Sequence, residues 1–96
     1  MILTPKAKQY GKRLQDVSMK YLGKWTSHWK ADQEDFDELM KMTFDDAKSL
    51  HMVGAYMMQG DIRKAYRLAC RLDTAVRDVI PNAVWNYLEK YTVDQE

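Results

Sequence analysis

Apolar residues recur along this chain at the spacing of α-helices. The first series advances in steps of four, three, four and four, which places its members on one stripe of a helix: Tyr10, Leu14, Val17, Tyr21 and Trp25. No stretch alternates apolar and polar residues for long, and no Asn-Gly or Asp-Gly dipeptide marks a hairpin. The pattern predicts an all-α protein, a compact bundle of four to five helices in a single domain without a sheet.

Capping residues and helix breakers divide this pattern into elements. Thr4-Pro5 is a helix start, with Thr as N-cap and Pro in the first turn. Gly60 suits a left-handed C-cap, and Asp61 suits the next N-cap. The predicted elements are a basic helix at 5–23, an acidic short helix at 32–41, a central helix at 44–59, an amphipathic helix at 62–79 and a C-terminal helix at 82–91.

Two features set the predicted centre of the bundle. Thr43-Phe44-Asp45-Asp46 resembles a capping box, so we expect a new helix to begin there. This helix is apolar on nearly every side, which is typical of a helix that is central to a core or buried in an interface. We expect it to form an antiparallel centre with the 62–79 helix, which should end before Pro81 because the residue preceding proline avoids helical geometry.

The chain is rich in methionine. The internal methionines are Met19, Met40, Met42, Met52, Met57 and Met58. Methionine fills irregular gaps in cores, and it is also frequent at adaptable binding surfaces. We interpret these residues as core, with a self-association or partner surface as the alternative.

Charge is segregated by position. Residues 1–30 hold seven basic residues and one acidic residue, a net charge of +6, whereas residues 31–46 hold seven acidic residues and one basic residue, a net charge of −6. The whole chain carries only +1. Such asymmetry indicates charged partners rather than a particular fold.

Three sets of charged residues are candidate partner-binding residues. Arg63, Arg67 and Arg71 follow a spacing of four along one helix ridge, and arginine is favoured at interfaces. Together with Lys12, Lys20 and Lys24 they would meet an acidic partner, whereas Asp35, Asp37 and Glu38 would meet a basic one. The alternatives are an ordinary solvated face, or an acidic segment that folds onto the basic faces within the chain.

The basic first helix also suggests nucleic acid. Lysine and arginine neutralise phosphates, and aromatic side chains stack on unpaired bases. Against this, Tyr10, Tyr21 and Trp25 share the apolar stripe and should turn inward, which leaves Trp29 as the aromatic free of it.

Signs of catalysis and of cofactor binding are lacking in the sequence. It contains no phosphate-cradling glycine-rich loop and no nucleophile elbow. His28 and His51 are far apart and lack flanking ligands at metal spacing. We therefore expect no enzymatic activity, no metal and no cofactor.

The compartment follows from cysteine and hydropathy. Cys70 is the single cysteine, so an internal disulfide is ruled out and a reducing compartment is indicated. We expect Cys70 to be a small packing residue. The chain starts without the apolar core of a signal peptide, and no run approaches the roughly 18 apolar residues of a membrane span. We expect a cytoplasmic protein of a bacterial or phage-infected host cell that does not bind membranes.

Two short segments resemble known families. Ala55-Tyr56, Gly60-Asp61 and Ala65 are similar to the turn of a tetratricopeptide-type helical hairpin, although Val53 and Arg77 depart from that repeat. Residues 67–87 resemble the C-terminal part of the Hha/YmoA family through Arg67-Leu68-Ala69, Asp78, Ile80-Pro81, Val84-Trp85 and Tyr87. That resemblance implies a small helical protein that modulates gene expression by binding a nucleoid-structuring protein. The rest of the chain departs from the family, and no partner-contact residue is carried over.

These observations favour a small non-enzymatic modulator or inhibitor that docks on a protein partner through segregated charged faces. A regulator of gene expression and a phage-type inhibitor of a host protein both fit this description. The alternative is a protein that binds nucleic acid directly and largely without sequence preference. Self-association into a homo-oligomer is compatible with either.

Overall fold

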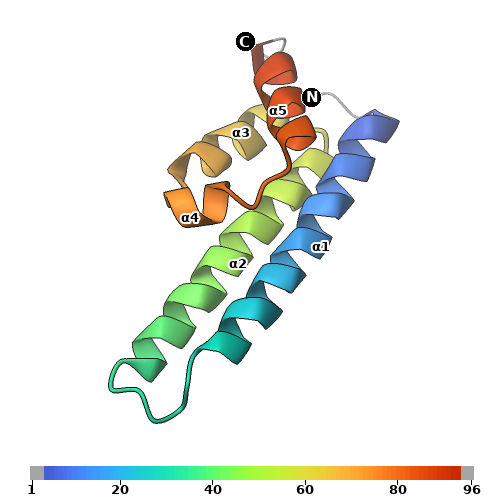
Figure 1. The fold of residues 1–96 in the computed structure, drawn as a ribbon. Coiled ribbons are helices and arrows are strands. Elements are labelled where there is room, and N and C mark those ends of the chain that lie inside the picture. Colours follow the sequence, from blue (N-terminus) through green and yellow to red (C-terminus); the bar gives the residue numbers. More distant parts are fainter. Residues whose placement is uncertain (1–3, 94–96) are drawn as a thin grey trace.

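In the computed structural model, which describes residues 4–93, the chain forms five helices and no strand (Figure 1). The helices are α1 (Pro5–His28), α2 (Phe36–Met58), α3 (Ile62–Arg71), α4 (Thr74–Arg77) and α5 (Asn82–Val93). The all-α class and the number of helices agree with the sequence pattern.

The two long helices form an antiparallel hairpin, and their interface is the most extensive in the molecule. Gly11 of α1 and Gly54 of α2 face each other at a close approach of the two helix backbones. A Cβ built on either glycine would lie 2.5 Å from the carbonyl oxygen of the other. The expectation that helices 44–59 and 62–79 form the centre is therefore wrong, because the paired glycines let α1 and α2 pack more closely and over a greater length.

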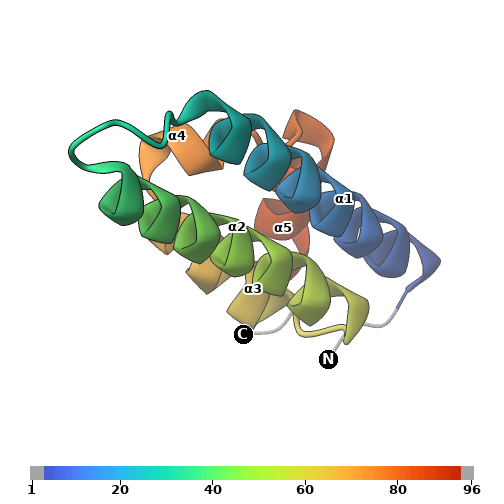
Figure 2. The ribbon, with the colours of Figure 1, turned by 90° about the horizontal axis from the view of Figure 1, so that it is seen from below.

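The remaining helices lie on one side of this hairpin (Figure 2). Leu50, Val53 and Met57 of α2 are fully buried there, in one cluster with apolar residues of the later helices. Those partners are Ile62, Ala65, Ala69, Leu72, Val76, Ile80, Val84, Tyr87 and Leu88. The apolar side predicted for 62–79 thus forms the second wall of the core.

The start of α1 is fastened to α5 by two contacts. Thr4 accepts a hydrogen bond from the backbone N–H of Ala7, which confirms it as the N-cap, and its hydroxyl lies 2.8 Å from that of Tyr87. The rings of Tyr10 and Tyr87 meet edge to face at 5.3 Å between centroids. These contacts join residues more than 70 positions apart and hold the end of the hairpin against the core.

The first helix is longer than the predicted 5–23. Gly23 has open space around it and does not end the helix. The hydroxyls of Thr26 and Ser27 donate hydrogen bonds back to the carbonyls of Leu22 and Gly23. The last turn thus continues through His28 and carries Trp25 toward the second helix.

The predicted helices at 32–41 and 44–59 are one continuous helix. Thr43 does not cap a new helix, because its hydroxyl donates to the carbonyl of Leu39 one turn earlier. The same hydroxyl accepts a hydrogen bond from the indole N–H of Trp29 at 2.9 Å. The start of α2 also shifts to Phe36, because the chain from Lys30 to Gln33 forms a turn in which the Gln33 side chain accepts the N–H of Lys30.

The predicted helix at 62–79 is divided into α3 and α4. Leu72 and Asp73 adopt extended backbone angles between them. The break lets Leu72, Val76 and Ile80 all point into the core, and it brings α4 toward the hairpin. The C-terminal helix begins at Asn82 as predicted and runs on to Val93.

The turn between α2 and α3 agrees with the sequence. Gly60 has a φ of 81°, which is the left-handed region that favours glycine. The N–H of Asp61 bonds to the carbonyl of Tyr56, and that of Gly60 bonds to the carbonyl of Met57, as in a Schellman C-cap. The Asp61 side chain accepts the N–H of Lys64 and caps α3.

Candidate functional site

The acidic segment lies at the far end of the hairpin from α3 and α5 (Figure 1). Asp35, Asp37 and Glu38 are all exposed around the start of α2. Within residues 4–93, a salt bridge joins Lys64 of α3 to Asp61, the N-cap of the same helix. In this part of the chain, no acidic residue of the 32–46 segment forms a salt bridge with a lysine or arginine. Among the described residues, the alternative in which this segment forms salt bridges with the basic faces is therefore not observed.

The predicted basic residues fall into separate groups. Arg67 and Arg71 line one groove with Lys64, beside Met52 and Tyr56 of α2. Lys20 and Lys24 line another with Val17, Tyr21, Trp25 and Val79. Lys12 is exposed near the start of α1, and Arg63 is exposed on α3. The six basic residues therefore do not form one surface.

An apolar groove of about 400 Å³ lies between α1 and α2. Met19 and Leu22 of α1 and Phe44 and Met52 of α2 line it. Met19 is 61% exposed and Phe44 is 50% exposed. The lysine that borders this groove is Lys48.

Met42 and Met58 are exposed as well. Met57 is the methionine of the core cluster, so the interpretation of the methionines as core residues is wrong for most of the others.

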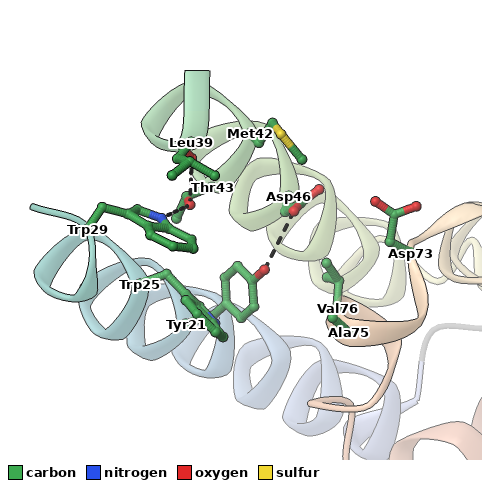
Figure 3. A pocket seen from close by; sticks show the side chains of 10 residues that line it. All are labelled: Tyr21, Trp25, Trp29, Leu39, Met42, Thr43, Asp46, Asp73, Ala75 and Val76. Carbon is green, nitrogen blue, oxygen red and sulfur yellow. Dashed lines mark hydrogen bonds between the residues drawn. The ribbon is translucent and has the colours of Figure 1, made fainter. Parts of the chain in front are cut away.

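A second cavity, of about 260 Å³, lies between α1, α2 and α4 (Figure 3). Three aromatic side chains from the end of α1 form one wall: Tyr21, Trp25 and Trp29. Two carboxylates line the cavity from other elements, Asp46 from α2 and Asp73 from the residue that precedes α4. Leu39, Met42, Thr43, Ala75 and Val76 complete the lining.

Hydrogen bonds hold the aromatic wall against α2. The indole N–H of Trp29 is bound to Thr43, and the hydroxyl of Tyr21 donates to a carboxylate oxygen of Asp46 at 3.5 Å (Figure 3). Trp25 stacks on Trp29 with 5.4 Å between ring centroids and 27° between planes. Trp29 is therefore half-buried and tied to the fold rather than free, which removes it as an unoccupied stacking platform for bases.

Asp46 is the carboxyl group of the cavity whose pKa is shifted. Burial raises the pKa of Asp46 above its ordinary value, and the charge of Asp73 raises it further, while the hydrogen bond from Tyr21 acts in the opposite direction. Burial also raises the pKa of Tyr21, and the Asp46 carboxylate adds to this effect. No positively charged side chain in the described chain lines the cavity, so its charge is negative.

The other candidate residues for chemistry lie apart. His28 and His51 are exposed on different helices, and Nδ1 of His51 is 3.1 Å from the hydroxyl of the buried Ser18. Cys70 is exposed, so its prediction as a packing residue is wrong. Within residues 4–93, no group of three or more His, Cys, Asp or Glu side chains is arranged to hold a metal ion.

The charged segments were predicted from the sequence, and the cavity was not. Its walls come from residues separated by up to 55 positions, and they meet because Thr43 is inside a helix and because the chain breaks before α4. The one local signal was the placement of Tyr21 and Trp25 on a common stripe, continued one turn later by Trp29.

Comparisons with family models, with curated proteins and with solved structures found no match for this chain. No described helix is both long and apolar enough to cross a membrane. The candidate site therefore rests on the geometry of this chain alone.

Proposed function

We propose that this chain is a non-enzymatic binding protein that docks on a basic region of a partner protein through its acidic end, as a modulator or inhibitor of that partner. The observation that carries the proposal is the state of the acidic segment. Its carboxylates are exposed around Asp35, Asp37 and Glu38, and within the described chain none forms a salt bridge with a lysine or arginine. An unpaired cluster of one sign attracts an oppositely charged surface and speeds association.

The apolar groove supports the same reading. Charge gives a complex its speed and orientation, but apolar burial supplies much of its affinity. Phe44 is half exposed, and it belongs to the helix that carries the acidic residues. A partner that binds the acidic end can extend onto this apolar surface without any change in the fold.

Charge-reversal variants test the proposal. The tagged protein is incubated with host lysate, and captured proteins are identified by mass spectrometry after crosslinking. Asp35→Lys combined with Asp37→Lys should abolish capture of a specific protein. Asp16→Lys combined with Glu89→Lys changes the net charge equally at other exposed positions and should leave capture intact. Circular dichroism checks that both variants remain helical.

The outcomes separate the two functional classes. If both charge-matched variants lose capture of the specific protein equally, or if neither loses it, docking through the acidic end is contradicted. Arg67→Glu combined with Arg71→Glu measures the contribution of the basic groove in the same assay. Direct nucleic-acid binding instead predicts retention of labelled DNA or RNA at low salt, with affinity that falls linearly on a log–log plot as salt is added.

A further inference from the structure

We propose that the cavity between α1, α2 and α4 binds an organic cation, an alkylammonium or guanidinium group, against the rings of Tyr21, Trp25 and Trp29 and the carboxylates of Asp46 and Asp73 (Figure 3). This site goes beyond the proposed function, because it holds whether or not the acidic end docks on a protein.

The chemistry of the lining selects a cation. Aromatic rings attract positive charge through the negative potential of their faces. Asp46 and Asp73 add two negative charges from facing elements, and none of the described lining residues supplies a positive one. The mutual repulsion of the carboxylates, which contributes to the raised pKa of Asp46, would be relieved by a cation between them.

The same lining disfavours other ligands. An anion would be repelled by both carboxylates. Calcium takes six to eight oxygen ligands and magnesium takes six, whereas this cavity offers two carboxylates beside largely aromatic and aliphatic walls. A guanidinium group is weakly hydrated, and an alkylammonium group carries apolar substituents, so each can contact the aromatic wall while its charge faces the carboxylates.

The size of the cavity limits the ligand to a small group. Its volume of about 260 Å³ is below the roughly 300–1,000 Å³ of sites for drug-sized ligands. The Nζ of Lys24 lies over the Trp25 ring, 5.5 Å from its centroid, although Lys24 is not among the residues that line the cavity. The cation is therefore either a small free molecule or the end of a lysine or arginine side chain.

Indole N–H signals in NMR provide the assay. Tetramethylammonium chloride and methylguanidinium chloride are titrated into the ¹⁵N-labelled protein, with sodium chloride used to keep the ionic strength constant. We expect saturable shifts of Trp25 and Trp29. Trp85 is the internal reference, because it does not line the cavity. Shifts that fail to saturate, or that affect Trp85 equally, overturn the proposal.

Matched variants test the carboxylates. Asp46→Asn keeps the shape of the side chain and an acceptor for Tyr21, and it should weaken cation affinity about fivefold, the effect of one charge at contact distance. Asp45→Asn removes an equal charge from an exposed neighbour that does not line the cavity, and should leave affinity nearly unchanged. Equal weakening by both variants means that only the general negative field attracts the cation, which also overturns the proposal.

A peptide arm distinguishes the source of the cation. Acetylated and amidated Gly-Gly-Lys-Gly-Gly is compared with the same peptide carrying norleucine in place of lysine. If the lysine peptide binds saturably and the norleucine peptide does not, the ligand is a side-chain cation. If the small cations bind and the lysine peptide does not, the ligand is a free cation. No response to any of these probes refutes the site.

Discussion

Replacing Gly11 or Gly54 by alanine should destabilise the fold, although alanine normally stabilises helices. In an open helix, Gly→Ala raises stability by about 0.5–1 kcal/mol. At Gly11 the added Cβ would lie 2.5 Å from the Gly54 carbonyl oxygen, 2.6 Å from Met58 Cγ and 3.0 Å from Met58 N. Two of these atoms belong to helix backbone, so they cannot move aside without moving α2 itself.

The cost follows from the displacement that this clash requires. The hairpin must separate locally, which loosens the packing of the buried residues on either side of the contact, Ala7 and Leu14 in α1 among them. Overpacking of this kind costs about 1–3 kcal/mol. For a domain of this size, each kcal/mol corresponds to about 4–8 °C in Tm. We therefore expect Gly11→Ala to lower Tm by roughly 4–24 °C, and Gly54→Ala to act in the same direction.

Gly23→Ala is the matched control. It lies in the same helix, but nothing approaches within 4 Å of the position where its Cβ would be. It should raise Tm by a few degrees, because only the helix propensity changes. Thermal and urea unfolding followed by circular dichroism measure all three variants. Equal Tm values for the Gly11→Ala and Gly23→Ala variants would refute the close approach of α1 and α2.

Three further changes test individual contacts. Thr43→Val preserves the shape of the side chain but leaves the indole N–H of Trp29 without its acceptor, so the free energy of unfolding in urea should fall by about 0.5–1.5 kcal/mol and the Trp29 indole signal should move. Asp61→Ala removes the N-cap of α3 and should cost about 1 kcal/mol in the same assay. The pKa of Asp46 is raised in the fold, so the stability this group contributes is fully present below its unfolded pKa and is lost as pH rises through its folded pKa. Asp73→Asn removes one cause of that shift, so an NMR titration should place the Asp46 midpoint at lower pH than in the parent protein; an unchanged midpoint would contradict the coupling.

Helical periodicity was sufficient to predict the class of the fold, because burying one stripe of each helix requires the same spacing whatever the tertiary arrangement. Local capping signals were sufficient at Thr4 and at the Gly60 turn, where the hydrogen bonds join residues within one or two turns. These are the positions at which local sequence and global structure agree.

Boundaries that depend on distant contacts could not be predicted in the same way. Thr43 carries the residue pattern of a capping box, yet its hydroxyl bonds to Leu39 and Trp29, so the tertiary contact keeps it inside the helix. Gly11 lies inside the predicted 5–23 helix and Gly23 at its end, and both lie inside α1. Only the position of α2 shows that the first is required for a close approach and the second is not.

The candidate site also has a part that the sequence predicts and a part that depends on distant contacts. The segregation of charge could be predicted from the sequence, because it depends only on the numbers of basic and acidic residues in neighbouring segments. The cavity depends on Asp73 and Val76, which reach the end of α1 only after the chain has turned at Gly60 and broken before α4. Its aromatic wall alone is indistinguishable in sequence from an ordinary buried stripe.

The acidic end and the cavity have a spacing that a single ligand segment can match. Asp35 and Asp46 are eleven residues apart, about three turns, so they share one side of α2 and are separated by about 16 Å. In an extended segment, residues an even number of positions apart point to the same side, and four to six residues cover about 13–20 Å. A basic segment with cationic residues four or six positions apart would therefore place one charge at the exposed start of α2 and the other in the cavity. Binding through both points should be tighter than binding of a peptide whose cations are two residues apart, since the latter reaches only one of them.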